Sequence, residues 1–123
     1  MGSIILVLST IIGILHVIIM GLEMFASNEK QAQTFGMPLE FVKLPNAQIA
    51  LKNMGIYNGS LGLVMIASVF IFQGTTRFSV LLLLNLFVVI IGLYGGKTVT
   101  KSIYLIQALP ALITLILILM KLV

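Results

Sequence analysis

Residues 1–22, MGSIILVLSTIIGILHVIIMGL, contain no lysine, arginine, aspartate or glutamate. A helix that crosses a bilayer needs about 20 mostly apolar residues, so this stretch is long enough to span one. Three further stretches without charged residues lie at 53–76, 78–96 and 102–120. Helices satisfy their own backbone polar groups in lipid, and none of these stretches alternates as a membrane β-strand would. The sequence predicts four transmembrane helices, at residues 3–26, 49–73, 77–96 and 102–121.

The composition supports this interpretation. The 123 residues are 60% hydrophobic and 8% charged, against roughly 25% charged in soluble domains. The mean hydropathy is +1.23, which excludes a soluble enzyme, a disordered chain and a nucleic-acid-binding domain. The absence of cysteine excludes disulfides, thiolate metal sites and cysteine nucleophiles. We expect one transmembrane domain over residues 1–123.

The connections between the helices predict their arrangement. Tight turns at 75–77 and 95–97 make consecutive helices antiparallel neighbours, which gives an all-α, up-down-up-down bundle. The segment 27–48 is longer, mixes apolar with polar residues and is interrupted by Pro38 and Pro45. We predict a partly helical segment at the membrane interface, with a plain connecting loop as the alternative.

The charges predict the orientation of the helices in the membrane. Four spans place both termini on one side, together with Arg77 and Lys121. The first and third loops carry the other basic residues, which are Lys30, Lys43, Lys52, Lys97 and Lys101. By the positive-inside rule these loops are cytoplasmic and the termini outside. The net charge of +4 therefore describes topology, and we expect no nucleic-acid partner.

The first helix carries one continuous stripe of unusual residues, at Ser9, Gly13, His16, Met20 and Glu23. Spacings of four and three place all of them on one face, which we expect to contact protein. Glu23 suits a proton carrier, an acid or base, or a cation ligand. Alternatively it is a structural carboxylate hydrogen-bonded to the second helix.

His16 is the single histidine of the chain. It suits a proton relay or a ligand contact, or else an ordinary hydrogen bond between helices. With Met20 and Met24 it offers ligands to a soft metal ion. Methionines at helical spacing are more typical of packing, so we predict no metal site. No residue pattern points to a particular cofactor.

The start of the second helix is unusually polar, with Asn53, Tyr57 and Asn58 beside Gly55 and Gly59. The two asparagines diverge by roughly 140° on a helix, so they cannot reach the same neighbour. We expect one to bond to the first helix and the other to the third or fourth. Glycines four apart allow close helix approach, either within one chain or between chains.

Several polar residues therefore gather in the cytoplasmic half of the bundle. We predict a pocket there that binds a small molecule or lipid, lined by His16, Met20, Glu23, Asn53, Tyr57, Asn58 and Gln107. The alternative is that these groups only tie helices together.

The run Leu15–Phe25, with its His16, Glu23 and Phe25, resembles a small bacterial membrane family catalogued as domain of unknown function thirteen-oh-four. The resemblance continues through Phe35-Gly36, residues 53–59, residues 92–98 and residues 107–111. Met54 departs from the glutamine expected there, and Ser27 from an aromatic residue. The resemblance implies a four-helix membrane protein and supplies no established activity.

The sequence is compatible with three kinds of function. The pocket could serve a binding protein or an enzyme acting on a membrane-soluble substrate, with Glu23 and His16 as the acid and base. A small proton-coupled transporter acting as a homodimer is the second alternative. A structural or regulatory subunit that binds a partner helix is the third.

Overall fold

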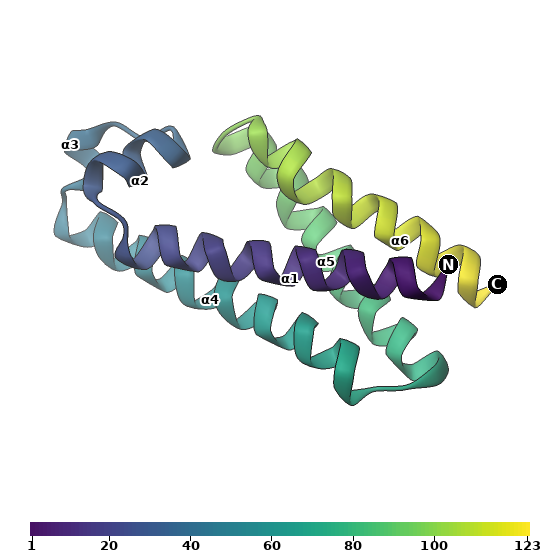
Figure 1. Ribbon diagram of the computed structural model, residues 1–123. Coiled ribbons are helices and arrows are strands. Elements are labelled where there is room, and N and C mark those ends of the chain that lie inside the picture. Colours follow the sequence, from purple (N-terminus) through teal and green to yellow (C-terminus); the bar gives the residue numbers. More distant parts are fainter.

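The chain is an all-α membrane protein with four long helical segments, as predicted. The computed structural model describes residues 1–123. The long segments are α1 (Gly2–Phe25), α4 (Pro45–Ile71), α5 (Gly74–Thr98) and the pair η1 (Tyr104–Ala108) and α6 (Leu109–Leu122), which is continuous. Each is long and apolar enough to cross a membrane. Successive segments run antiparallel, and both termini lie at one end of the bundle (Figure 1).

Several helix boundaries differ from the expected ones by a few residues. The second span begins at Pro45. Proline suits the first turn of a helix because a backbone N–H there has no carbonyl partner within the helix, and proline lacks this N–H. The third span continues to Thr98, so Gly95 and Gly96 lie within the helix. The tight turn predicted at 95–97 is therefore wrong, and the chain reverses over residues 99–101 instead. The tight turn predicted at 75–77 is also wrong, because α5 already begins at Gly74 and the chain reverses at residues 72–73.

The segment between α1 and α4 is partly helical, as predicted. It contains α2 (Asn28–Phe35) and α3 (Leu39–Val42). The Ser27 hydroxyl caps α2 by accepting a hydrogen bond from the Lys30 N–H. Gly36 ends the helix with φ of 63°, a left-handed conformation that glycine adopts without a steric penalty.

Two glutamines hold this segment against the end of α1. The Gln31 amide donates to the backbone oxygens of Glu23, at 2.9 Å, and Leu22, at 3.3 Å. Gln48 donates to the Gln31 side-chain oxygen and to the Val42 carbonyl. These bonds satisfy carbonyls that the end of a helix leaves without partners. They anchor α2 and α3 over one end of the bundle, hereafter the loop end.

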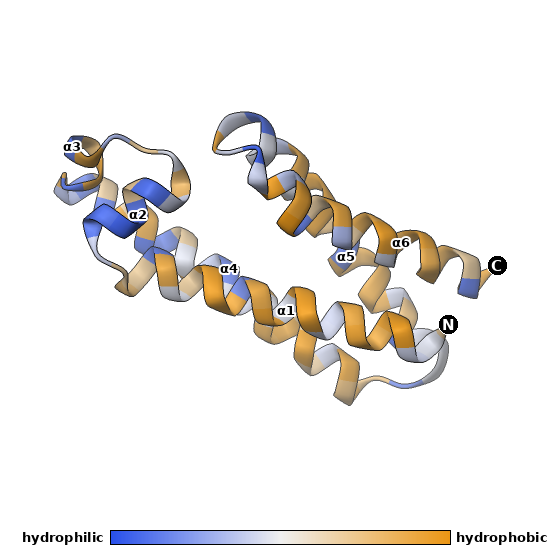
Figure 2. Cartoon of the chain, turned by 45° about the horizontal axis from the view of Figure 1, so that its top comes forward, coloured by the Kyte–Doolittle hydropathy of each residue, from blue (hydrophilic) through white to orange (hydrophobic).

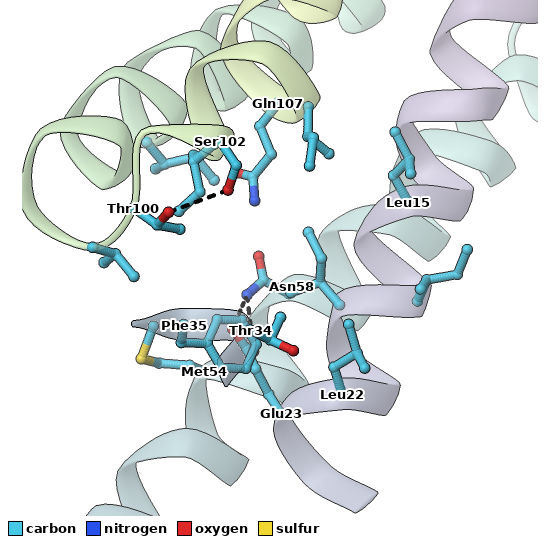
Figure 3. A pocket seen from close by; sticks show the side chains of 16 residues that line it. Leu15, Leu22, Glu23, Thr34, Phe35, Met54, Asn58, Thr100, Ser102 and Gln107 are labelled. Carbon is cyan, nitrogen blue, oxygen red and sulfur yellow. Dashed lines mark hydrogen bonds between the residues drawn. The ribbon is translucent and has the colours of Figure 1, made fainter. Parts of the chain in front are cut away.

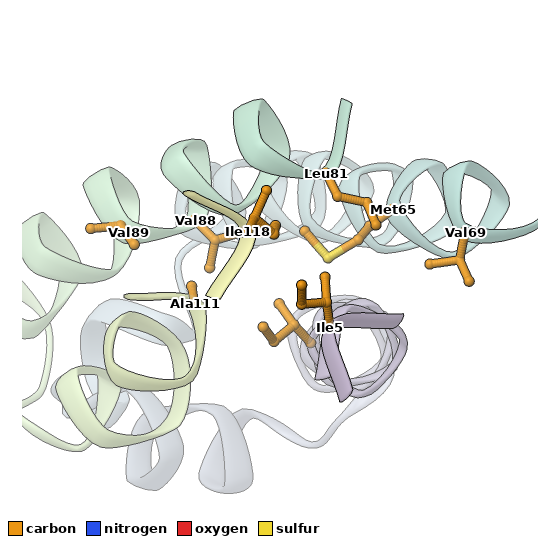
Figure 4. Packing of buried hydrophobic residues seen from close by; sticks show 9 residues of the cluster. Ile5, Met65, Val69, Leu81, Val88, Val89, Ala111 and Ile118 are labelled. Carbon is orange, nitrogen blue, oxygen red and sulfur yellow. The ribbon is translucent and has the colours of Figure 1, made fainter. Parts of the chain in front are cut away.

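The long helices pack as two pairs, α1 with α4 and α5 with α6 (Figure 1). Their shared apolar core lies toward the end that carries the termini (Figure 4). Side chains from all four long segments meet there, and each is at most 1% exposed. They are Ile5 and Ile12 of α1, Met65 of α4, Leu81 of α5 and Ile118 of α6. Large apolar side chains are exposed on all four long segments, as contact with lipid requires. Hydrophobic residues dominate these segments in Figure 2.

Glycines form the contact between α1 and α4. Gly13 and Gly62 face one another so closely that a Cβ atom on Gly13 would lie 2.9 Å from the Gly62 carbonyl oxygen. Toward the loop end, Gly59 lies against Met20 and Gly55 against Met24. In lipid, helix association depends on such van der Waals contact, because apolar burial contributes little there. We call this contact the glycine seam.

The second glycine pair packs α5 against the last span. A Cβ on Gly92 would approach the Ala108 backbone nitrogen at 2.9 Å, and Gly96 lies against the Tyr104 ring. Both glycine pairs are therefore used within the chain.

The glycine seam predicts a contrast between two Gly→Ala variants, one in the seam and one outside it. In Gly62→Ala the new methyl group meets the Gly13 backbone and the His16 Cβ. We expect the free energy of unfolding to fall by roughly 1–3 kcal/mol. Unfolding in mixed dodecylmaltoside and dodecyl sulfate micelles, followed by circular dichroism, measures this change.

Gly21→Ala is the matched control, because nothing lies within 4 Å of a Cβ at Gly21. Its unfolding free energy should be unchanged or rise by up to about 1 kcal/mol, because alanine favours a helix over glycine. Equal effects of the two substitutions would contradict the seam.

Candidate functional site

Pro110 explains an irregular turn in the last span. A proline inside a helix lacks an N–H and its ring clashes with the carbonyl four residues earlier, here that of Ile106. The chain responds with the π-helix η1, in which the Leu109 N–H bonds to the Tyr104 carbonyl five residues back. Such single π-turns are frequent at functional sites. The sequence signal was a proline within an otherwise apolar span, and it was not used in the prediction.

A cavity of about 350 Å³ lies beside this π-helix at the loop end. Pockets that bind small ligands usually measure roughly 300–1,000 Å³. Its walls come from α1, α4, α5, η1, the end of α2 and the turn before η1 (Figure 3). Most of the lining is apolar, with Glu23 as its one charged residue. The lining residues are Leu15, Ile18, Ile19, Leu22, Glu23, Thr34, Phe35, Met54, Asn58, Ile91, Val99, Thr100, Ser102, Ile103, Ile106 and Gln107.

Glu23 and Asn58 form the polar centre of the cavity. The Asn58 side-chain N–H₂ donates to both carboxylate oxygens of Glu23, at 3.1 and 3.0 Å. Glu23 is 3% exposed, and no lysine, arginine or histidine lies within ion-pair distance of it. The predicted bond from an asparagine of the second span to the first is confirmed. The carboxylate therefore faces an apolar cavity with one amide group as its hydrogen-bond partner.

Gln107 lies across the cavity from this pair. In Figure 3 the Asn58 and Gln107 side chains point toward one another, and the Asn58 oxygen is directed away from Glu23. Thr34, Thr100 and Ser102 add hydroxyl groups at the loop end, with the last two 3.3 Å apart. These three residues were missed in the prediction, because hydroxyl residues in loops are too common to mark a site.

Four of the seven candidate residues lie outside the cavity lining. Tyr57 is 78% exposed on the outside of α4. Asn53 is exposed too, and it bonds to the Ile49 carbonyl of its own helix at 3.1 Å. The expected bond from the second asparagine to the third or fourth span is therefore wrong, because Asn53 faces outward. Met20 packs against Gly59 in the glycine seam.

His16 is the fourth, and it is buried in the bundle, away from the cavity lining. Its Nδ1 donates to the Ile12 carbonyl at 2.8 Å, and its Nε2 has no protein partner. Seven positions separate it from Glu23, about 10 Å along the helix. The two groups proposed as acid and base are therefore not assembled around one reacting atom. No cluster of three or more histidine or acidic side chains is placed to hold a metal ion.

Polar groups also continue beyond the cavity into the other half of the bundle. Ser9, Asn85 and Thr114 are completely buried. The Asn85 amide lies 3.5 Å from the Ser9 hydroxyl and bonds to the Leu81 carbonyl at 2.8 Å. Thr114 likewise bonds to a carbonyl of its own segment, that of Pro110. The donors of Asn85 and Thr114 bond to backbone carbonyls, whereas the Asn85 side-chain oxygen has no hydrogen-bond partner.

Comparison with known proteins places the chain in a family. A family model described as "Protein of unknown function (DUF1304)" matches residues 10–119. The chain is 33% identical over 112 residues to the "Uncharacterized protein YpaA" of Lactococcus lactis subsp. lactis (strain IL1403), covering 90% of this chain and 92% of that protein. No solved structure matches the chain significantly. Both matches agree with the resemblance found in the sequence, and the chain belongs to this four-helix membrane family of unknown function.

Proposed function

We propose that the protein binds a lipid-soluble small molecule or lipid in the cavity at the loop end. The observation that carries this proposal is the Glu23 carboxylate, which lies in an apolar cavity with a single amide donor. A charged group near the membrane interior is costly unless it is paired. Intramembrane ionisable residues of this kind commonly mark substrate or ion sites.

The shape of the cavity favours entry from the bilayer. Ile18 of α1 and Ile106 of η1 line the cavity, yet they are 53% and 47% exposed on the outside of the bundle. The cavity therefore reaches the lipid-facing surface between these two elements. A ligand with an apolar body would pass between them without crossing water.

The arrangement favours binding over acid–base catalysis. A general acid and a general base must both reach the reacting atoms within about 3 Å. His16 lies outside the cavity, and no second titratable side chain lines it. Asn58 and Gln107, which face each other across the space, are suited to orient a ligand through hydrogen bonds.

The proposal predicts that a larger side chain in the cavity wall removes a bound molecule. We expect native mass spectrometry of the protein released from nanodiscs to detect an adduct of one molecule per chain. In Ile91→Phe the added ring occupies the cavity, so this adduct should be lost.

Ile90→Phe is the matched control, because Ile90 is 60% exposed on the outer face of the same helix and does not line the cavity. It should retain the adduct. A parent protein without any adduct, or equal retention in both variants, would contradict the proposal.

We also propose that the loop end faces the cytoplasm. Five of the seven basic residues, Lys30, Lys43, Lys52, Lys97 and Lys101, belong to the loop end, and Arg77 and Lys121 belong to the opposite end. The positive-inside rule assigns the more basic side to the cytoplasm. In this orientation the cavity opens in the cytoplasmic half of the membrane.

The orientation predicts opposite labelling of two single-cysteine variants. The chain has no cysteine, so each introduced thiol is unique. Thr76→Cys, in the turn region at the start of α5, should react with a membrane-impermeant maleimide on intact spheroplasts. Glu40→Cys, at an exposed position of α3, should react after permeabilisation. The reverse pattern would invert the proposed topology.

A further inference from the structure

The polar centre of the cavity is rich in hydrogen-bond acceptors. An ionised carboxylate offers about four lone-pair sites, and one Asn58 N–H₂ group serves both oxygens of Glu23. Because the Asn58 nitrogen is committed to Glu23, its amide orientation is determined. The Asn58 oxygen therefore points into the cavity, where it has no partner within the chain (Figure 3). A ligand that complements this centre must bring hydrogen-bond donors.

The charge of the cavity lining also favours a ligand with hydrogen-bond donors, and specifically a cationic one. Glu23 is its one charged lining residue, and Lys97 in the last turn of α5 and Lys101 in the turn after it are not part of the lining. An anionic group would meet the carboxylate without a cation to offset the repulsion. A cationic group would supply the counter-charge that a buried carboxylate requires. No aromatic cage surrounds Glu23, since Phe35 is the one aromatic residue of the lining.

We propose that the ligand is a lipophilic amine, whose ammonium group binds the Glu23 carboxylate and the Asn58 oxygen. This inference rests on the proposed binding function and adds the chemistry of the head group. A primary ammonium has three N–H donors, which match two carboxylate oxygens and one amide oxygen. Its apolar body lies along Leu15, Ile19 and Ile103 and leaves the bundle between Ile18 and Ile106.

The oxygen acceptors of Glu23 and Asn58 distinguish a primary ammonium, which has N–H donors for them, from a quaternary one. Quaternary ammonium groups have no N–H and are usually recognised by several aromatic faces. This cavity offers oxygen acceptors instead. The structure therefore assigns a preference for ammonium groups that carry hydrogen over those that do not.

A tryptophan reporter makes this preference measurable, because the chain has no tryptophan of its own. Phe35→Trp places the reporter in the cavity wall. Phe87→Trp places it on the lipid-facing side of α5, where the parent side chain is 52% exposed. Bromine quenches tryptophan fluorescence at contact. Quenching of the first reporter beyond that of the second therefore reports entry into the cavity rather than partition into lipid.

The probes are four amphiphiles with the same dodecyl chain, which carries bromine on a carbon close to the head group, tested in phosphatidylcholine nanodiscs. Their head groups are a primary amine, a trimethylammonium, a hydroxyl and a sulfate. We expect the amine to bind at least about tenfold more tightly than the alcohol, as a charge-assisted hydrogen bond predicts. The trimethylammonium should bind more weakly than the amine, and the sulfate should not quench the cavity reporter selectively.

Two variants separate the head group from the cavity. Glu23→Gln keeps the size of the side chain and removes its charge, so the amine should lose about tenfold in affinity and approach the alcohol. Ile91→Phe should abolish selective quenching by every probe. The comparison of head groups in the protein with native Glu23 does not depend on how well Glu23→Gln folds.

The outcomes distinguish this inference from the proposed function. If amine and alcohol quench equally and Ile91→Phe blocks both, the cavity binds amphiphiles but the amine preference is wrong. If no probe quenches the cavity reporter beyond the lipid-facing one, both proposals fail. An amine preference that Glu23→Gln removes supports both of them.

A further comparison identifies the source of the amine. Phosphatidylethanolamine carries a primary ammonium in its head group, whereas phosphatidylcholine does not. If phosphatidylethanolamine in the nanodisc competes with the brominated amine, the ligand is a membrane lipid. If it does not compete, the ligand is a free lipophilic amine.

Discussion

The direct contact between the backbones of α1 and α4 at Gly13 and Gly62 is the constraint on which the rest of the bundle depends. Burial of apolar surface contributes little free energy to helix association in lipid, so the association depends on close packing. Once the two glycines meet, the antiparallel register of the helices is set along the seam, through Gly59 toward the loop end. That register brings Glu23 and Asn58 into hydrogen-bonding distance. The polar centre of the cavity is therefore a consequence of glycine packing farther along the same two helices.

The cavity exists because the two helix pairs are joined by a tight apolar core toward one end and by polar elements at the other. Toward the termini, Ile5, Leu81 and Ile118 are completely buried in the core that joins the two pairs. At the loop end the π-turn before Pro110 interrupts regular packing, and α2 closes over the gap. A Cβ at Gly36, where α2 ends, would lie 3.5 Å from the Val99 carbonyl oxygen, so the two connections that frame the cavity come close together there.

The spans could be predicted from the sequence because the bilayer imposes one constraint on all of them, a long stretch without charge. The buried face of α1 was predictable for a similar reason, since helical periodicity places Ser9, His16 and Glu23 together. Periodicity on one helix does not say which neighbour a face meets. Asn58 and Asn53 illustrate this limit, because one reaches Glu23 and the other faces outward. The π-turn has a local signal in Pro110, whereas the bonds of the glutamines depend on tertiary contacts, which leave no local pattern.

The contrast between Gln31 and Glu23 bears on the role of the carboxylate. Gln31 is 1% exposed, and both ends of its amide have partners, two backbone carbonyls and the Gln48 side chain. Complete hydrogen bonding of this kind is typical of a buried polar group that holds structural elements together. Glu23 is buried to a similar extent and carries a more costly charge, yet it has one amide donor and faces an apolar space. A purely structural carboxylate would gain from further donors, or from replacement by an apolar residue of similar volume. The Glu23 carboxylate lacks a counter-charge and further hydrogen-bond donors. A bound cationic group would supply both.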